Sequence, residues 1–232
     1  MDFFCNDKPI KIELNPKKFK RHAVKTHFIN QGENYIDIIS KYISPIYKDG
    51  DVLCMCEKVI SLCQGRVIKR EDIKIGFWAK FLAKFAGKTP AGIGVGEPIK
   101  MQYAINKAGL LKVIYASICS AITKLFGKKG VFYNIVGHGV AGLDGFYPKV
   151  WKEYSDIGIE LPENPTGVCN EIKEKLGISC YLVDANDLSI EILGYSSDLS
   201  YTEDELKELI IDNPAGQGRE LTPFVLIRPT SK

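Results

Sequence analysis

The chain has 232 residues, of which 45% are hydrophobic and 25% are charged, so it is long enough to bury a sizeable core without disulfides. Its 31 basic and 28 acidic residues give a net charge of +3, which does not indicate nucleic acid as a partner. The longest apolar stretch is shorter than the roughly 20 residues that span a bilayer, and no secretory signal pattern is present near the N-terminus. We therefore expect a soluble, cytoplasmic protein with no membrane or nucleic-acid partner.

The seven cysteines are an odd number and lie mostly within apolar runs, which is typical of a reducing compartment. Cys54 and Cys56 alternate along a predicted strand, but no second Cys or His pair has the spacing of a zinc finger. We interpret the cysteines mainly as small core residues.

The first predicted elements along the chain are strands and one helix. Alternating apolar residues predict strands at 10–14 and 23–29, and residues 35–43 carry their apolar side chains on one helical face. A turn at 48–51 leads into the short apolar run 52–56, which predicts a buried strand.

Residues 76–128 are predicted to be predominantly helical. Within them, the glycine-spaced segment 92–96 lacks the ending and the spacing of phosphate-binding loops, so we interpret it as a flexible loop. The apolar stretch 108–122 predicts a buried helix. In residues 77–85, aromatics and lysines recur at helical spacing, a pattern also found in helices that lie on membranes. We favour packing on a core or on a partner subunit for this segment.

The second half of the chain mixes strands and helices without a clean alternation. The predicted elements are a strand at 130–135, a glycine-rich loop at 137–145, a helix at 165–176, a strand at 178–183, a helix at 202–211 and a strand at 223–228. Thr166 and Gly177 are the predicted cap and stop of the first helix, and Thr202 with Glu205 fits a capping box for the second. The order predicts an α+β or irregular α/β fold, with mixed sheets and flanking helices in a single domain over residues 1–232.

Several oxygen-bearing side chains follow apolar runs. Asp144 and Asp184 each end such a run, and Asn186 and Asp187 add oxygens beside Asp184. Hard divalent cations prefer carboxylate and amide oxygens presented in this way. Ordinary turn chemistry, in which Asp and Asn bond their own backbone, explains the pattern equally well. His138, between two glycines, is equally open to interpretation as a general base or as an exposed loop residue.

Four collinear blocks resemble motifs of the γ-glutamyl ligases of deazaflavin coenzyme F-420 biosynthesis. The first block, residues 48–68, is similar to the family's DGDVL segment and to the K-I-V-S and E-G-R positions after it, and the second, residues 140–144, is similar to NAG-V/I-D. The third block, residues 161–165 with 182–186, is similar to LP-x-DP and I-x-DT. The fourth, residues 216–228, is similar to MG-Q/E and PVVVVR. The blocks cover most of the chain in the family's order, and the resemblance implies that family's fold.

The resemblance also implies an activity, namely a ligase that uses GTP or ATP with Mg²⁺ or Mn²⁺ to join an amine to a small carboxylic acid through an acyl phosphate. By motif position, Asp144, Asp184 and Gln217 would hold the metal, and Lys58 would approach the phosphates or the acid. Asp144, Asp184 and Lys58 are thus the implied catalytic residues. The implied cofactor-binding residues are Ser61, Gly65, Arg66 and Asn186. The family also implies a homodimer.

The chain departs from the family's motifs in several places. Ala185 replaces a threonine, Gln64 a glutamate and Val140 an asparagine, and residues 187–191 replace the family's GR-x-x-R continuation. Ala185 and Gln64 motivate an alternative function, that of a catalytically inactive nucleotide- or metal-binding homologue serving as a regulator or partner subunit.

A third hypothesis is a surface-interaction module. Lysines crowd residues 11–25, where a solvated face and a phosphate-binding arm are both open interpretations, and residues 77–85 hold the aromatic–lysine pattern. Solvent exposure of Trp78 and Phe81 would favour this hypothesis.

Overall fold

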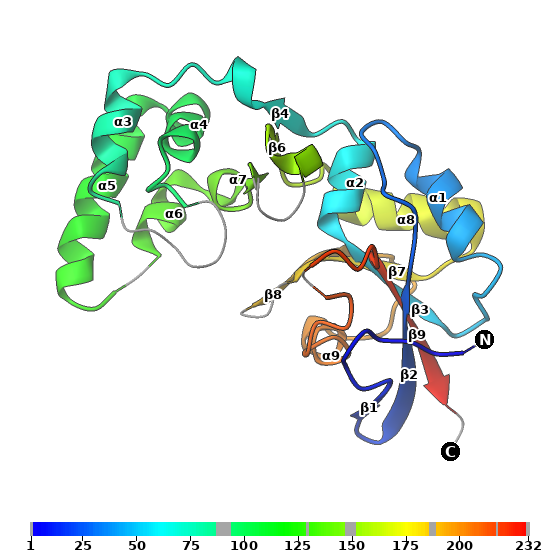
Figure 1. Cartoon of the computed structure of the whole chain (residues 1–232). Helices are drawn as coiled ribbons and strands as arrows, with labels where there is room; N and C mark the ends of the chain where they lie inside the picture. The colour runs from blue at the N-terminus through cyan, green and yellow to red at the C-terminus, as the bar shows by residue number, and fades with distance from the viewer. Residues whose placement is uncertain are drawn as a thin grey trace. The chain divides into compact units, whose positions relative to one another are not determined.

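The computed structural model of the chain describes residues 2–86, 94–128, 130–146, 152–185, 189–216 and 218–230. The chain falls into two compact units, one combining residues 1–65 with 162–232 and the other formed by residues 66–161. The second unit is therefore inserted into the first along the chain. Strands and helices occur in both (Figure 1), which confirms the predicted α+β class.

The described part of the first unit is built on a mixed six-stranded sheet in the order β1-β2-β9-β3-β7-β8. Neighbouring strands are antiparallel except β3 and β7, which run parallel. The strands are β1 (Lys11–Leu14), β2 (Lys17–Val24), β9 (Phe224–Thr230), β3 (Val52–Cys56), β7 (Cys180–Ala185) and β8 (Ile190–Tyr195). The strands predicted at 52–56, 178–183 and 223–228 are confirmed, with small shifts at their ends.

The central strand β3 separates two apolar cores. Its Leu53 and Met55 join the core beneath helices α1, α2 and α8, whereas Val52 and Cys54 join the core beneath α9. A strand covered on both faces is apolar throughout, which explains the unbroken apolar run at this position. The helices are α1 (Tyr35–Tyr42), α2 (Glu57–Cys63), α8 (Pro165–Leu176) and α9 (Glu203–Glu208).

Helix ends in this unit follow the sequence signals, with one difference. The capping box of α9 is present, since the Thr202 side chain accepts from the Glu205 N–H while the Glu205 side chain accepts from the Thr202 N–H. Gly177 ends α8 in the left-handed conformation. The cap of α8 is Asn164, whose side chain accepts from the Gly167 N–H, so the prediction of Thr166 is wrong by two positions. Pro165 at the first helical position fixes the start before Thr166.

The lysine-rich segment near the N-terminus forms β2, and the strand predicted at 23–29 is displaced toward it. Phe19, Arg21 and Ala23 alternate inward, and the partly exposed Lys20 and His22 lie between them on the outward side. Arg21 is fully buried because its guanidinium donates to both carboxylate oxygens of Asp212, at 2.5 and 2.9 Å. The segment is thus half of a sheet strand and not simply a solvated face.

The second unit combines a small sheet with helices. Its described strands pair in the order β4-β6-β5, and helix residues pack around one apolar core. The elements are β4 (Val67–Lys69), β6 (Ile157–Ile159), β5 (Asp144–Gly145), α3 (Phe77–Ala83), α4 (Pro98–Ala108), α5 (Leu110–Leu125), α6 (Val131–Val136) and α7 (His138–Ala141), with short 3₁₀ turns at Arg70–Asp72 and Lys152–Tyr154. Helices α3, α4 and α5 occupy the segment 76–128, which was predicted to be helical.

Three predictions in this unit are wrong. The strand predicted at 130–135 is helix α6, because Phe132 and Val136, one turn apart, both pack into the core and override the strand propensity of their sequence. The glycine-rich loop predicted at 137–145 holds α7 and β5. The helix predicted as buried is α5, and only its Val113 and Ala116 are buried.

The carboxylate of Asp198 provides a pH-dependent contribution to stability. Burial alone would raise its pKa, but hydrogen bonds from Ser179, Lys173 and Ser196 lower the pKa to about 2. A depressed folded-state pKa stabilises the protein above the unfolded value of 3.8, and the contribution is lost as the pH falls toward 2. We expect Asp198→Asn to flatten the fall in melting temperature between these two pH values. An unchanged profile would contradict this assignment.

Candidate active site

The predicted site residues divide between the two units. The first unit holds Lys58, Ser61, Gly65 and Asp184, and the second holds Arg66 and Asp144. The predicted positions outside the described part are Asn186, Asp187, Gln217 and the side chain of His138.

Strand β3 runs into α2 without an intervening loop. Cys56 ends the strand with an extended backbone and is the cap of α2, so Lys58 lies in the first turn, just beyond the carboxyl end of the strand. Ser61 is fully buried, and its Oγ has no hydrogen-bond partner among the described residues. Gly65 follows the helix at a φ of +70°, which glycine adopts without steric cost. The Ser61 hydroxyl is thus a buried polar group that the described residues around it leave without a hydrogen-bond partner.

Asp184 lies at the carboxyl end of β7, beside the end of β3. The two strands are parallel and Cys56 pairs with Val183, so Lys58, just after β3, and Asp184, near the end of β7, lie at the same edge of the sheet. Burial raises the pKa of the Cys56 thiol, the Lys58 charge lowers it and the Asp184 charge raises it further. The charges of Lys58 and Asp184 therefore both act on the Cys56 thiol. This edge brings together a cation and an anion that were singled out from distant parts of the sequence.

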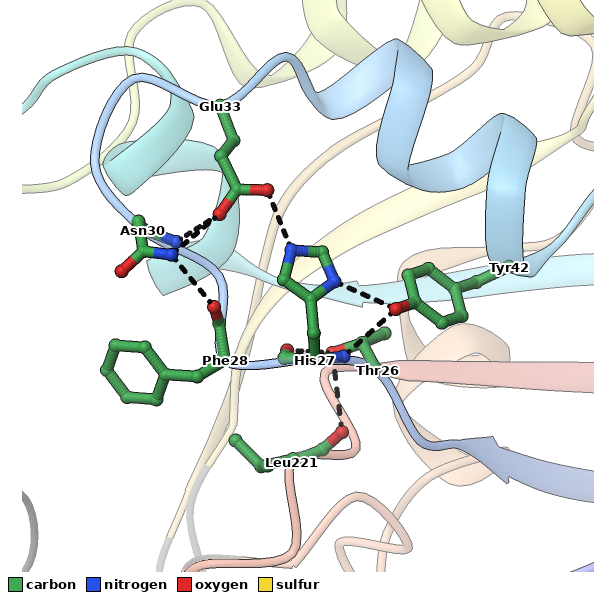
Figure 2. Close-up of polar contacts among 7 residues, drawn as sticks. All are labelled: Thr26, His27, Phe28, Asn30, Glu33, Tyr42 and Leu221. Carbon is green, nitrogen blue, oxygen red and sulfur yellow. Dashed lines mark hydrogen bonds and ion pairs between the residues drawn. The ribbon is translucent and has the colours of Figure 1, made fainter.

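A hydrogen-bonded chain of three titratable side chains lies in the same unit (Figure 2). The imidazole of His27 contacts Tyr42 Oη through Nδ1 at 2.8 Å and Glu33 Oε2 through Nε2 at 2.7 Å. The backbone N–H of His27 donates to the same tyrosine oxygen at 3.1 Å. The Glu33 carboxylate accepts hydrogen bonds, so Nε2 carries a proton and donates to it. Nδ1 and Tyr42 Oη share the second hydrogen bond of the ring.

Glu33 is held in place by its own loop. Burial would raise the pKa of Glu33, but the backbone N–H of Asn30, at 2.6 Å from Oε1, and the His27 and Asn30 side chains lower it. The loop contacts the end of α2, since the Gly32 N–H donates to the Leu62 carbonyl at 3.0 Å. Neither the six-residue spacing of His27 and Glu33 nor the helical position of Tyr42 follows a catalytic motif, so sequence reasoning missed this chain.

In the second unit, Asp144 starts the two-residue strand β5 and pairs with Ile159 of β6. The turn before it is fixed by Lys100, a buried lysine whose Nζ donates to the carbonyls of Ala141 and Leu143 at 3.1 and 3.0 Å. Gly142 lies so close to the Leu161 side chain that a Cβ at this position would be 2.4 Å from Leu161 Cγ. Lys100 and Gly142 therefore determine where the backbone presents Asp144.

Arg66 has an acidic partner within its own unit. Its guanidinium lies 3.2 Å from Glu160 Oε2, and Glu160 also accepts from Tyr103 Oη at 2.7 Å and Lys107 Nζ at 2.8 Å. Burial would raise the pKa of Glu160, but the lysine and tyrosine hydrogen bonds and the arginine charge lower it. Glu160 was not predicted, because its three partners are far apart in the sequence. The role of Arg66 in binding a cofactor stays a prediction.

The donor set predicted for a metal has suitable chemistry. Asp144 and Asp184 are both partly exposed, and carboxylate oxygens are the ligands that Mg²⁺ and Mn²⁺ prefer. Across the described ranges, no group of three His, Cys, Asp or Glu side chains gathers to hold a metal ion. Because the two aspartates belong to different units, their convergence on one ion stays a prediction.

Comparisons with known proteins agree with the motif blocks. The family described as F420-0:Gamma-glutamyl ligase matches residues 23–182, which include β3, α2, the whole second unit, all of α8 and the first half of β7. The match ends two residues before Asp184. An uncharacterized protein of Methanocaldococcus jannaschii, MJ1361, is 23% identical over 184 residues, or 76% of this chain. The chain spans 61% of the length of that relative.

Proposed function

Because the chain belongs to the F420-0:gamma-glutamyl ligase family, we propose that it is a ligase that forms an amide bond between an amine and a small carboxylic acid, with GTP or ATP as co-substrate and Mg²⁺ or Mn²⁺ as cofactor. The observation that carries the proposal is the edge where β3 and β7 end together. Lys58 follows β3 in the first turn of α2, and Asp184 is the last residue but one of β7. A lysine beside a carboxylate offers a cation for phosphate oxygens and a ligand for a divalent metal.

The chemistry has two steps, and the proposed roles follow from the side chains. A carboxylate is a poor electrophile until a phosphoryl group is transferred to one of its oxygens, after which the amine displaces phosphate from the acyl carbon. When bound, the metal would neutralise charge on the triphosphate. Asp144, Asp184 and Gln217 would hold it, and Lys58 would orient the phosphates or the acid. Ser61, Gly65, Arg66 and Asn186 would shape the nucleotide site.

One contact favours the alternative of an inactive homologue acting as a regulator or partner subunit. The amide of Gln64 stands where the family keeps a glutamate, and its nitrogen donates to the Glu163 carbonyl at 2.9 Å while its oxygen accepts from the Glu163 N–H at 2.8 Å. A glutamate makes only the second of these bonds. Gln64 thus ties two segments of the first unit together and leaves no carboxylate at this position.

Ligand-induced stabilisation tests the proposal. With Mg²⁺ or Mn²⁺ and a nucleotide at about 100 times its Kd, we expect a stabilisation of about 2.7 kcal/mol, which raises the melting temperature by roughly 5–10 °C for a chain of this length. Asp144→Ala and Asp184→Ala should each abolish the shift. Asp156→Ala and Asp204→Ala, at exposed positions in the second and first unit, should retain it.

Turnover then separates the two functions. Phosphate release is measured with a panel of amino acids and small carboxylic acids in the presence of nucleotide and metal. Release that requires both an acid and an amine supports the ligase. Nucleotide binding without turnover favours the regulator, and no thermal shift at millimolar metal and nucleotide overturns the nucleotide site altogether. By analogy with the family we also propose that the protein is a homodimer and is located in the cytoplasm. Light scattering on the same samples tests the homodimer, and fractionation of cells tests the location.

A further inference from the structure

In helix α3 of the second unit, the small apolar residues are buried and the large ones are exposed, which is the reverse of the usual arrangement. Ala79 and Ala83 are buried, whereas Phe77, Trp78 and Phe81 are 71%, 44% and 42% exposed. The outward rings touch one another, with Phe77 and Phe81 stacked at 6.0 Å between centroids. A helix in a soluble core normally buries its aromatic side chains. The exposure of Trp78 and Phe81 is the condition under which a surface-interaction role gains support.

Helix α5 repeats the reversal over its whole length. Val113 and Ala116 face the core, while the opposite face shows large apolar side chains at alternating spacings of four and three residues. These exposed residues are Leu111, Tyr115, Ile118, Ile122 and Leu125. The spacing keeps them on one continuous stripe. Soluble monomers rarely expose apolar stripes of this extent unless something covers them.

Both helices belong to the same small structure. Their buried residues enter one core cluster, and each helix packs on α4, as Figure 1 shows. The exposed faces therefore point away from a shared core. We name the exposed apolar residues of α3 and α5, together with Phe85 and Phe126, the apolar ridge.

The charge around the apolar ridge identifies the kind of partner. From Lys74 to Lys128 the chain has nine lysines and a single acidic residue, Glu97. The whole second unit, residues 66–161, holds fifteen basic and seven acidic residues, so the rest of the chain holds the other sixteen of the 31 basic and twenty-one of the 28 acidic ones. Lys80, Lys112 and Lys124 on the two helices, and Lys84 directly after α3, are exposed. A second copy meeting the same face would place lysines against lysines, whereas an anionic surface would neutralise them.

An anionic membrane surface fits both properties. Exposed Trp, Phe, Leu and Ile side chains enter the boundary between headgroups and acyl chains, and flanking lysines bind anionic headgroups. A nucleic acid uses the lysines but leaves the aliphatic stripe of α5 in water. Within the described ranges, no helix is long and apolar enough to cross a membrane, so contact is peripheral. We propose that the second unit docks on anionic lipid surfaces through the apolar ridge and its lysines, which replaces the expectation from the sequence that the protein has no membrane partner.

Vesicle binding by the full chain tests the proposal. We expect sedimentation with equimolar phosphatidylglycerol and phosphatidylcholine vesicles, weak binding to phosphatidylcholine alone, and loss of binding at about 1 M salt, where charges are screened within about 3 Å. In a Trp151→Phe background, Trp78 fluorescence should shift to the blue on binding. Equal binding to both vesicle types, or no binding at low salt, overturns the proposal.

Variants connect the binding to the apolar ridge. Phe81→Ser with Ile118→Ser should weaken vesicle binding by more than about tenfold, and Lys80→Gln with Lys84→Gln by about tenfold. All four positions are exposed, so circular dichroism should remain unchanged. Ile211→Ser, at a 66% exposed position in the first unit, is the matched control and should bind normally. If Phe81→Ser with Ile118→Ser instead dissociates a dimer and leaves vesicle binding intact, the ridge is an interface between copies and the lipid proposal is wrong.

Discussion

Replacing Arg228 with methionine is expected to lower the free energy of unfolding by about 3–5 kcal/mol, the range for breaking a buried ion pair. Arg228 of β9 donates to both carboxylate oxygens of Asp51, from Nε at 2.8 Å and from a terminal nitrogen at 2.6 Å. Asp51 is 2% exposed and also accepts from the Lys48 N–H at 2.9 Å. Without the guanidinium, the carboxylate remains in the core with too few donors.

Urea unfolding measures this effect, and the neighbouring strand supplies a control. Lys18 of β2 lies directly opposite Thr230 of β9. Its ammonium group pairs with Glu13 at 3.0 Å, but the side chains of both residues are about two-thirds exposed. Lys18→Met should therefore cost less than about 1 kcal/mol. Adding Asp51→Leu to Arg228→Met should restore part of the loss, because the uncompensated charge is removed. Equal effects of Arg228→Met and Lys18→Met would show that the buried pair has no special weight.

Substituting Gly145 with alanine should destabilise the protein by about 2–6 kcal/mol through backbone strain and overpacking, each costing about 1–3 kcal/mol. Gly145 follows Asp144 in β5 at a φ of +99°, and a Cβ there would lie 2.3 Å from the Ile157 carbonyl oxygen. The clash is with backbone, so no rotamer change relieves it. Because β5 carries Asp144, nucleotide- and metal-induced stabilisation should weaken as well.

A second glycine separates strain from the clash. Gly137 has a similar φ of +105°, but nothing lies within 4 Å of its Cβ position. Gly137→Ala should therefore cost only the strain, about 1–3 kcal/mol. Urea unfolding of the two variants gives the cost of the clash as the difference between them. If the two variants are equally stable, the close approach of Ile157 does not restrict this position.

Local signals were sufficient for the first unit's central strands, for the C-terminal end of α8 and for the start of α9. The apolar run of β3 and the capping box at Thr202 are determined by a few neighbouring residues. Strand β2 was misplaced because its inward positions include Arg21, a residue that reads as solvated until Asp212 comes within reach from the far end of the chain. Such a pair is a tertiary contact that periodicity does not encode.

For the site, the motifs led to the right segments but not to their supporting contacts. Asp51 and Arg228 belong to the first and last motif blocks, and the structure gives them a structural role as an ion pair. Lys58 and Asp184 lie at one sheet edge because β3 and β7 are parallel neighbours. Sequence order alone does not give this pairing. The chain of His27, Glu33 and Tyr42 and the partners of Glu160 depend on loops and on long-range packing, so no local spacing reveals them.

The insertion of the second unit has a consequence for how this chain can vary in length. Its first and last strands pair with each other, Val67 opposite Ile159, and the Glu160 N–H donates to the Arg66 carbonyl at 3.0 Å. The chain thus enters and leaves the unit at adjacent points, where a short loop can bridge the gap. Residues can be inserted into the second unit, deleted from it or exchanged with those of another gene while its two connections to the first unit stay in place. Recombination can therefore alter the lysine-rich unit without changing the sheet that carries Lys58 and Asp184.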